Sequence, residues 1–180
     1  MNATTSLEPP RFIDWYESPV GPLIAMATNS ALCGLSFSDA DALQERLQEL
    51  RHRHEPTLLP GRSALLDDLR TQLQEYFQGR RRDFTLPLSS AGSAFQERVW
   101  AALCEIPYGD TWSYLDLAIR VGDAQATRAV GYANGANPIA IVIPCHRVIN
   151  SGGGEGGYGG GLWRKRILLD LERGQGTLAL

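Results

Sequence analysis

A cysteine, a histidine and an arginine stand side by side at positions 145–147, directly after the apolar run Ile141–Pro144. Polar groups at the end of a buried run must be paired or must face a ligand, because burying them unpaired costs free energy. Proline disfavours helix before it, so we expect an extended run that turns at Cys145. A base or a positive charge beside a thiol makes it a nucleophile. The pattern indicates either cysteine chemistry or a small buried cysteine beside a satisfied histidine.

Cys145 and His146 do not meet simply by being neighbours. Adjacent side chains point to opposite faces of a strand or about 100° apart around a helix, so proton transfer between them is expected to pass through a water molecule or a tight turn. The other cysteines, Cys33 and Cys104, lie far from Cys145 in the sequence and in no metal-ligand spacing. We therefore expect no disulfide framework, no metal site and no cofactor.

The composition is that of an intracellular globular protein. Of the 180 residues, 43% are hydrophobic and 21% are charged, which excludes a disordered chain and allows one large or two small domains. The N-terminus lacks the basic and apolar regions of a signal peptide, and no window approaches the length of a membrane span. We expect a soluble, cytoplasmic protein that makes no membrane contact.

Charge is distributed unevenly along the chain. The net charge is −3, yet residues 111–180 carry 7 Arg and Lys against 5 Asp and Glu. This argues against an indiscriminate nucleic-acid-binding protein and places any contact with a polyanion in the C-terminal half. Arg80–Arg82 is interpreted as a solvated helix end, and its role stays open.

The N-terminal half shows strand and helix signals but no reactive constellation. Apolar runs at 12–17, 22–28 and 31–37 are separated by turn-forming residues and predict three antiparallel strands. Amphipathic helices are expected at 42–50 and 63–78. With a linker at Ser89–Ser93, the chain divides into an α/β support domain at 1–92 and a second domain at 93–180.

The second domain shows a helix-turn-helix pattern before the Cys-His turn. Ser93 and Gln96 have the spacing of a capping box and open a helix to about residue 105. A short helix ending at Arg120, a turn at 121–123 and a second helix at 124–134 follow. In that second helix Arg128 is the one long cationic side chain among small residues. Such a helix suits close approach to a DNA groove without reading the base sequence.

Two features follow the Cys-His turn. The stretch at 151–161 is rich in glycine, so it is either a flexible linker or a loop that approaches a ligand, with Tyr158 as its ring. A last helix is expected at 162–173. Glu172 lies near its C-terminus, where a negative charge opposes the helix dipole, so this carboxylate is expected to have a partner.

Together these motifs resemble the O6-alkylguanine-DNA alkyltransferase (methylated-DNA–protein-cysteine methyltransferase) family. The resemblance rests on RAVG at 128–131, Asn137-Pro138, PCHRV at 144–148, GYGG at 157–160, Lys165, and Leu168-Leu169 leading to Glu172. It covers about 93–175 and extends more weakly over the strand-rich start. It implies an α+β fold, in which a ribonuclease-H-like α/β domain precedes a helical, winged helix-turn-helix-like DNA-binding domain.

The resemblance implies direct-reversal DNA repair. An O6-alkylguanine, or an O4-alkylthymine, would be flipped out of duplex DNA, and its alkyl group would pass irreversibly to Cys145, once per molecule. His146 would deprotonate Cys145 through a water molecule, and Glu172 would orient and charge His146. Asn137 would brace the active-site turn. Tyr114 would press on a phosphate and give a hydrogen bond or a proton to the guanine.

The resemblance also implies how the DNA is held. The helix-turn-helix would enter the minor groove of a duplex, with Arg128 filling the hole left by the flipped nucleotide, and the protein would act as a monomer, with or without cooperativity along DNA. Tyr158 would wall the base pocket, and backbone groups around Val148 and Gly159 would meet the base edge. Family members often have Ser at the position of Gly159 or Arg at that of Gly135, and neither is present here. The implied DNA-binding set is Tyr114, Thr127, Arg128, Ala129 and Gly131.

Three other functions remain open from the residues alone. A cysteine hydrolase would use the same thiol and imidazole, but it needs two oxyanion donors and would turn over. A helix-turn-helix regulator would bind one base sequence and form no covalent product. Non-catalytic relatives of the family bind lesions without a nucleophile at position 145, where this chain has a cysteine.

Overall fold

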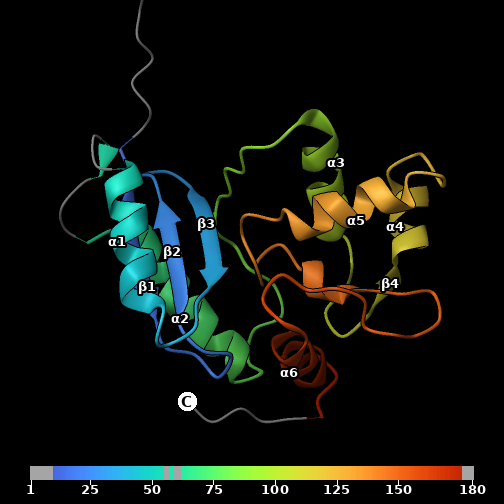
Figure 1. Ribbon diagram of the computed structural model, residues 1–180. Helices are drawn as coiled ribbons and strands as arrows, with labels where there is room; N and C mark the ends of the chain where they lie inside the picture. Colours follow the sequence, from blue (N-terminus) through green and yellow to red (C-terminus); the bar gives the residue numbers. More distant parts are fainter. Residues whose placement is uncertain (1–9, 55–56, 59–61, 176–180) are drawn as a thin grey trace, which may run out of the picture.

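The structure is a computed structural model that describes residues 10–54, 57–58 and 62–175. Figure 1 shows two lobes: β1–β3, α1 and α2 form one, α3, α4, α5 and β4 belong to the other, and α6 lies below and between them. The elements run β1 (Phe12–Tyr16), β2 (Leu23–Ala27), β3 (Leu32–Phe37), α1 (Leu43–His54), α2 (Ala64–Phe77), α3 (Ala94–Leu103), β4 (Trp112–Ser113), α4 (Tyr114–Arg120), α5 (Thr127–Gly135), the 3-10 turn η2 (Cys145–Arg147), β5 (Val148–Ile149) and α6 (Leu162–Glu172).

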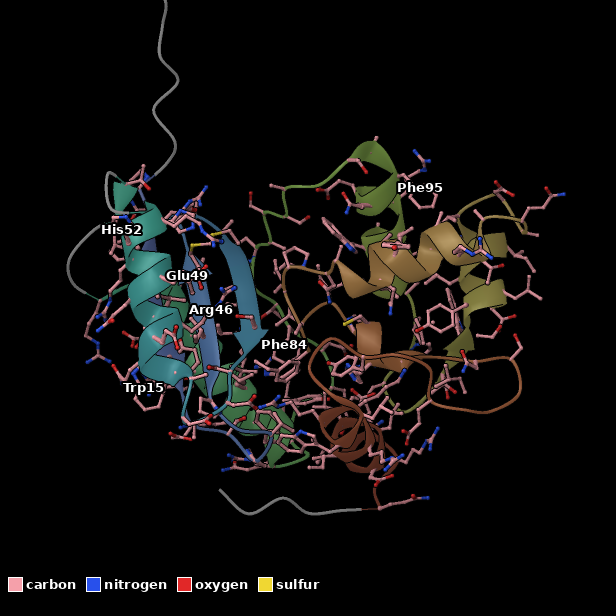
Figure 2. The ribbon with its side chains drawn as sticks, in the orientation of Figure 1. Trp15, Arg46, Glu49, His52, Phe84 and Phe95 are labelled. Carbon is pink, nitrogen blue, oxygen red and sulfur yellow. The ribbon has the colours of Figure 1, made fainter. Side chains whose placement is uncertain are left out.

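The predicted three-stranded antiparallel sheet is confirmed, with strand order β1-β2-β3. Successive side chains of a strand point to opposite faces, and in β2 this alternation decides which helix covers which face. Ile24 packs against Leu43 and Leu47 of α1. Leu23 and Ala25 point the other way, into the large core that also contains the apolar face of α2. On the outer surface of α1, Arg46 pairs with Glu49, and Figure 2 shows both side chains there.

The two lobes join at β3, the strand at the edge of the sheet. The backbone N–H of Leu35 donates to the Pro138 carbonyl (2.9 Å), and the Ala140 N–H donates to the Leu35 carbonyl (2.8 Å). An unpaired sheet edge is a liability, and here the segment before Cys145 covers it. The predicted division at 92/93 lies in the connection before α3, yet one hydrophobic cluster contains residues from both sides of it.

The helix-turn-helix pattern is present, but its second helix begins later than predicted. Ser93 and Ser113 each cap a helix, α3 and α4, through complete capping boxes. Helix α5 starts at Thr127 rather than at 124. The Asp123 carboxylate accepts a hydrogen bond from the Gln125 N–H (2.9 Å), and such a local side-chain bond competes with the first turn of a helix.

The prediction of an extended run before Cys145 is wrong. Ile139 makes one isolated bridge to Leu35, and the chain then turns through Ile141, whose φ is 70°. A β-branched residue rarely adopts positive φ, and the strain costs about 1–3 kcal/mol. The turn satisfies its own backbone, because the N–H groups of Val142 and Ile143 donate to carbonyls two and four residues back. A tight buried turn can therefore replace a strand here.

Candidate active site and DNA-facing groove

Cys145 lies in a cavity of about 620 Å³, where the thiol-bearing residue is only 6% exposed. A cavity of this size suits a ligand as large as a nucleobase. Of the three cysteines, Cys145 is the one that lines it; Cys104 is exposed, and Cys33 donates through its thiol to the Met26 carbonyl (3.2 Å). The other lining residues come from β3, α4, α5 and the two loops that flank η2: Leu35, Ser36, Phe37, Tyr114, Gly131, Asn134, Gly135, Asn137, Ala140 and 157–160.

Asn137 braces the turn that carries Cys145. Its side-chain N–H donates to the Ile143 carbonyl (2.8 Å), and its side-chain oxygen accepts from the Ile139 N–H (3.0 Å). The amide thus bridges the start and the end of the buried turn. The predicted contact is present, and any further part in catalysis stays a prediction.

Glu172 is the centre of a buried polar network behind Cys145. Its Oε1 accepts from His146 Nε2 (2.8 Å) and from the Tyr76 hydroxyl (2.7 Å), while Arg147 donates to both carboxylate oxygens through Nη2 (3.0 Å) and Nε (2.8 Å). The Gly109 N–H also donates to Oε2 (3.3 Å). The expected partner of Glu172 is therefore present. Sequence reasoning missed Arg147 and Tyr76 as parts of this network.

The charge of Glu172 fixes the tautomer of His146. Burial raises the pKa of Glu172, but the hydrogen bonds and charges of His146 and Arg147 outweigh burial and lower that pKa to about 2. An ionised carboxylate only accepts hydrogen bonds, so His146 Nε2 must carry the proton. The Nδ1 atom of the neutral ring is then an acceptor; it is buried and has no hydrogen-bond partner among the described residues. An unprotonated ring nitrogen without a partner is a candidate general base.

Burial opposes the charging of His146 by Glu172, so the role of Glu172 in charging the ring stays a prediction. Burial lowers the pKa of His146 below its usual value, despite the hydrogen bond and charge of Glu172. Burial likewise raises the pKa of Cys145, and the nearby Asn137 and Tyr158 oppose this only in part. Charge separation is costly away from water. In the folded chain both shifts favour the uncharged forms, a thiol and a neutral imidazole.

Two further side chains support the cavity. Lys165 is fully buried, and its Nζ donates to the carbonyls of Val148 (2.6 Å) and Glu155. It ties the glycine-rich loop to β5, a role that the sequence did not indicate although Lys165 belongs to the motif. Tyr158 lines the cavity as predicted, and its hydroxyl is buried beside the thiol. Val148 does not line the cavity, so its contact with a base stays a prediction.

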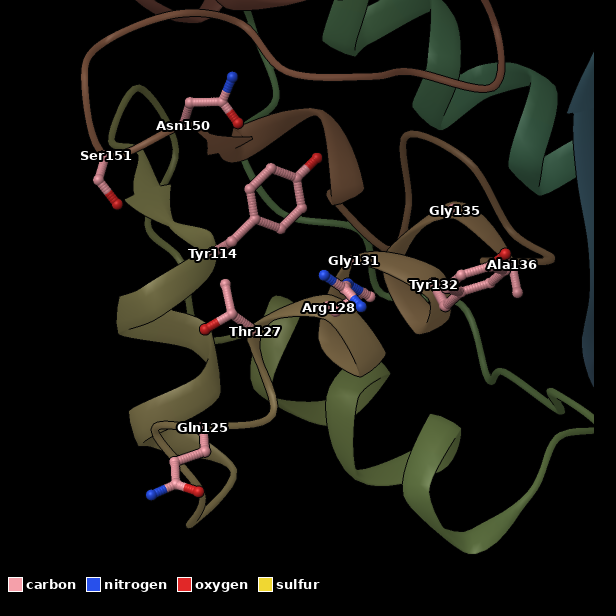
Figure 3. Close-up of a pocket in the computed structure, with 10 residues that line it drawn as sticks. All are labelled: Tyr114, Gln125, Thr127, Arg128, Gly131, Tyr132, Gly135, Ala136, Asn150 and Ser151. Carbon is pink, nitrogen blue, oxygen red and sulfur yellow. The ribbon is translucent and has the colours of Figure 1, made fainter.

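A wide groove of about 1140 Å³ runs along the helix-turn-helix, and Figure 3 shows its residues. Thr127 and Arg128 line it, whereas Ala129 is exposed on the same helix but is not a lining residue. Tyr132 is 81% exposed one helical turn after Arg128. Tyr132 and Tyr114 also line the groove, and the other lining residues are small or polar: Gln125, Gly131, Gly135, Ala136, Asn150 and Ser151.

The groove and the cavity share Tyr114, Gly131 and Gly135, so the groove opens toward Cys145 between α4 and α5. The pairing of β4 with β5 (Trp112 with Val148) sets Tyr114, the next residue but one, beside the strand that follows Cys145. A Cβ at Gly131 would lie 3.8 Å from the Tyr114 ring, so the small residue leaves the passage open.

Other sites can be set aside. Among the described residues, no group of three or more His, Cys, Asp or Glu side chains could hold a metal ion. Within the same residues, no helix has both the length and the apolar character that crossing a membrane requires. Arg80–Arg82 line neither the groove nor the cavity; Arg81 pairs with Glu75 (2.7 Å), and Arg82 lies over the Tyr108 ring.

The sequence and the fold both match proteins of one kind. Residues 94–174 match the DNA-binding domain of 6-O-methylguanine DNA methyltransferase, and residues 13–90 match its ribonuclease-like domain. A methylated-DNA–protein-cysteine methyltransferase of Mycolicibacterium paratuberculosis is 55% identical over 163 residues, 87% of this chain and 89% of the relative. One of Mycobacterium leprae is 44% identical over 162 residues, 88% and 90% of the two chains.

A solved structure shares the architecture. The crystal structure of Mycobacterium tuberculosis OGT in complex with DNA matches with a TM-score of 0.77 and 40% identity, over 91% of this chain and 94% of that one. The predicted fold class, a ribonuclease-like domain followed by a DNA-binding domain, is confirmed.

Proposed function

This chain belongs to the methylated-DNA–protein-cysteine methyltransferase family, and on that premise we propose that it repairs DNA by moving the alkyl group of O6-alkylguanine to its own Cys145. The observation that carries the proposal is the position of the thiol. Cys145 lies in a base-sized cavity that opens into a groove along a helix-turn-helix, with the His146–Glu172 pair behind it.

The reaction is a displacement at saturated carbon. His146 Nδ1 accepts the thiol proton through a water molecule, and the sulfur of Cys145 attacks the alkyl carbon. The S–C bond forms as the C–O6 bond breaks, and the electron pair of that bond stays with the guanine. Tyr114 gives the departing guanine a proton, and the proton that left Cys145 for His146 afterwards restores the Tyr114 hydroxyl. The net reaction therefore moves one proton from the thiol to the guanine. The thioether has no hydrolytic exit, so each molecule reacts once.

The lesion must leave the duplex to reach Cys145. Extruding a nucleotide costs a few kcal/mol, and a helix of small residues in the minor groove suits a protein that must work on any sequence. Arg128 would fill the vacated space, with Tyr114, Thr127, Ala129 and Gly131 at the phosphates and sugars. O4-alkylthymine would use the same cavity. We propose a monomer that acts on DNA in the cytoplasm.

Intact-mass measurement tests the function directly. After incubation with a duplex that contains O6-methylguanine, the protein should gain the mass of one methyl group, and the amount methylated should never exceed the amount of protein. A cysteine hydrolase would leave no stable adduct at the end of the reaction. A sequence-specific regulator would gain no mass and would ignore the lesion.

Arg128→Ala should separate base extrusion from chemistry. Arg128 lines the groove but not the cavity, so we expect transfer from duplex DNA to slow about 10- to 100-fold, which corresponds to about 1.4–2.8 kcal/mol. Reaction with free O6-benzylguanine should change little, because no base must be extruded. Rates on both substrates are measured by mass spectrometry.

Arg120→Ala is the matched control for Arg128. Arg120 is an exposed cation at the end of α4, pairs with Glu105 (2.5 Å) and lines neither space. Its removal should leave both rates near those of the unchanged protein. Equal slowing on duplex and free base by Arg128→Ala would instead place Arg128 in the chemical step.

A further inference from the structure

One wall of the Cys145 cavity comes from the N-terminal lobe, which carries none of the catalytic residues. Leu35, Ser36 and Phe37 of β3 line this wall. Figure 1 shows β3 on the side of the sheet that faces the second lobe. The docking of β3 on the segment before Cys145, through Leu35, therefore fixes the distance between this wall and the thiol.

Phe37 lines the cavity that contains Cys145 but does not line the groove. Tyr114, Gly131 and Gly135 line both the groove and the cavity, so they mark the entrance from the groove. Phe37 and Cys145 line only the cavity, so they lie beyond that entrance. A base that enters beside Tyr114 presents its exocyclic substituent inward, toward the thiol. The alkyl group must then fit among the cavity residues beyond the entrance, and Phe37 is one of them.

Phe37 also packs tightly against the glycine-rich loop. Its ring meets the Tyr158 ring edge-on at a centroid distance of 5.8 Å. A Cβ at Gly160 would lie 2.5 Å from Phe37 Cδ2, far inside van der Waals contact, so the ring fills the space above this glycine. The aromatic ring of Phe37 therefore limits the cavity on the side of Tyr158 and Gly160.

Arg164 holds this wall in place. Its side chain is buried, with the guanidinium 5.3 Å from the Phe37 ring centroid. Nε donates to the Val20 carbonyl (2.7 Å), Nη2 to the Ser38 carbonyl (2.9 Å) and Nη1 to the Gly160 carbonyl (2.8 Å). One planar, rigid donor group thus ties the end of β3 to the glycine-rich loop. The wall cannot easily retreat from a large substituent.

We propose that Phe37 is a specificity-determining residue that limits the size of the alkyl group transferred to Cys145. The inference rests on the proposed function, since it concerns which O6-substituents the same site accepts. Methyl and other small groups fit in front of the ring, whereas a benzyl group competes with it for space. A pocket that gains or loses several carbon atoms typically changes its discrimination by 10-fold or more.

Opposite substitutions at Phe37 test the proposal. Each variant reacts with O6-methylguanine and with O6-benzylguanine, placed in the same duplex, and the benzyl-to-methyl rate ratio is measured. Phe37→Ala should raise this ratio about 10-fold, and Phe37→Trp should lower it. Loss of active protein cancels, because both substrates are compared on one preparation. An unchanged ratio in both variants would overturn the proposal.

Trp15→Ala is the matched control. Trp15 is an aromatic of the same sheet, half-buried like Phe37, but it packs against the α1 side and does not line the cavity. Figure 2 shows it on the far side of the N-terminal lobe from α6. Trp15→Ala should leave the benzyl-to-methyl rate ratio unchanged. A rise in this ratio like that expected for Phe37→Ala would instead show that any large loss of packing in the N-terminal lobe changes the selectivity. Absence of any transfer by the unchanged protein would contradict the proposed function itself.

A double substitution measures the contact directly. Gly160→Ala should push against Phe37 and slow benzyl transfer about 10-fold relative to methyl transfer, and Phe37→Ala should remove most of that effect. Coupling of this sign is expected if the ring and the loop share the space that the alkyl group needs. Independent effects of the two substitutions would contradict the proposed wall.

Discussion

Replacement of Cys145 by alanine should abolish alkyl transfer, because the sulfur forms the new bond and no neighbouring group can take its place. Cys145 is the cysteine that lines the cavity, and we propose that its thiol is both the nucleophile and the source of the proton. Intact-mass measurement with O6-methylguanine duplex should show no added methyl group. Peptide mapping of the unchanged protein should place the methyl group on Cys145.

The other cysteines provide the controls. Cys104→Ala and Cys33→Ala should keep transfer, because one residue is exposed at the end of α3 and the other lies in the N-terminal sheet. Cys145→Ala should still bind lesion DNA, since Tyr114 and Arg128 of the groove are unchanged. A methyl group found on Cys104, or transfer by Cys145→Ala, would contradict the assignment.

Replacement of Glu172 by glutamine should weaken the fold and slow the reaction together. Removing one partner of a buried ion pair typically costs about 3–5 kcal/mol, and here Arg147 would lose its charge partner. The substitution keeps the size of the side chain and deletes the charge. Thermal unfolding at neutral pH should show the loss as a lower midpoint.

The stability difference should depend on pH in one direction. The pKa of Glu172 falls from an ordinary 4.5 to about 2 in the folded chain. A depressed pKa gives stability that is present above 4.5 and is lost as the pH falls toward 2. The gap between the unchanged protein and Glu172→Gln should therefore narrow in acid. If the difference in stability between the two proteins stayed constant from pH 4.5 to pH 2, the charge of Glu172 would not be the source of that difference.

The rate of Glu172→Gln should also respond to pH. Without the negative charge, the positive form of His146 is less stabilised and Nδ1 is a poorer base, so we expect transfer at neutral pH to be about 100-fold slower. Above neutral pH the thiolate of Cys145 forms without help, so the deficit should shrink as the pH approaches the thiol pKa, which burial raises. Single-turnover rates across pH measure this, and a parallel profile in both proteins would reduce Glu172 to a structural role.

Tyr76→Phe is the control that separates the two effects. It removes one hydrogen bond to Glu172 (2.7 Å) and leaves the carboxylate and its pairing with His146 intact. We expect a loss of about 1 kcal/mol in stability. The pH profile of transfer should keep its shape, because the tautomer of His146 is unchanged.

The sequence by itself predicted most of the elements and a candidate reactive residue. Short apolar runs separated by turn residues predict the sheet, and the capping-box spacing at Ser93 places the start of α3, because these signals are local and need no distant partner. PCHRV points to Cys145 through its resemblance to the family's motif. The position of Glu172 against the helix dipole predicts that it has a partner.

Only the tertiary structure decided which groups meet. The partners of Glu172 come from residues 63 and 96 positions away in the chain, at Gly109 and Tyr76, and no spacing rule reaches that far. The run before Cys145 looks extended in the sequence, but burial from several sides and the bracing amide of Asn137 make it a turn. Phe37 is an ordinary strand residue until β3 docks against the cavity. The directions in which the pKa values of Cys145 and His146 shift were decided in the same way, because burial is a property of the folded chain rather than of its motifs.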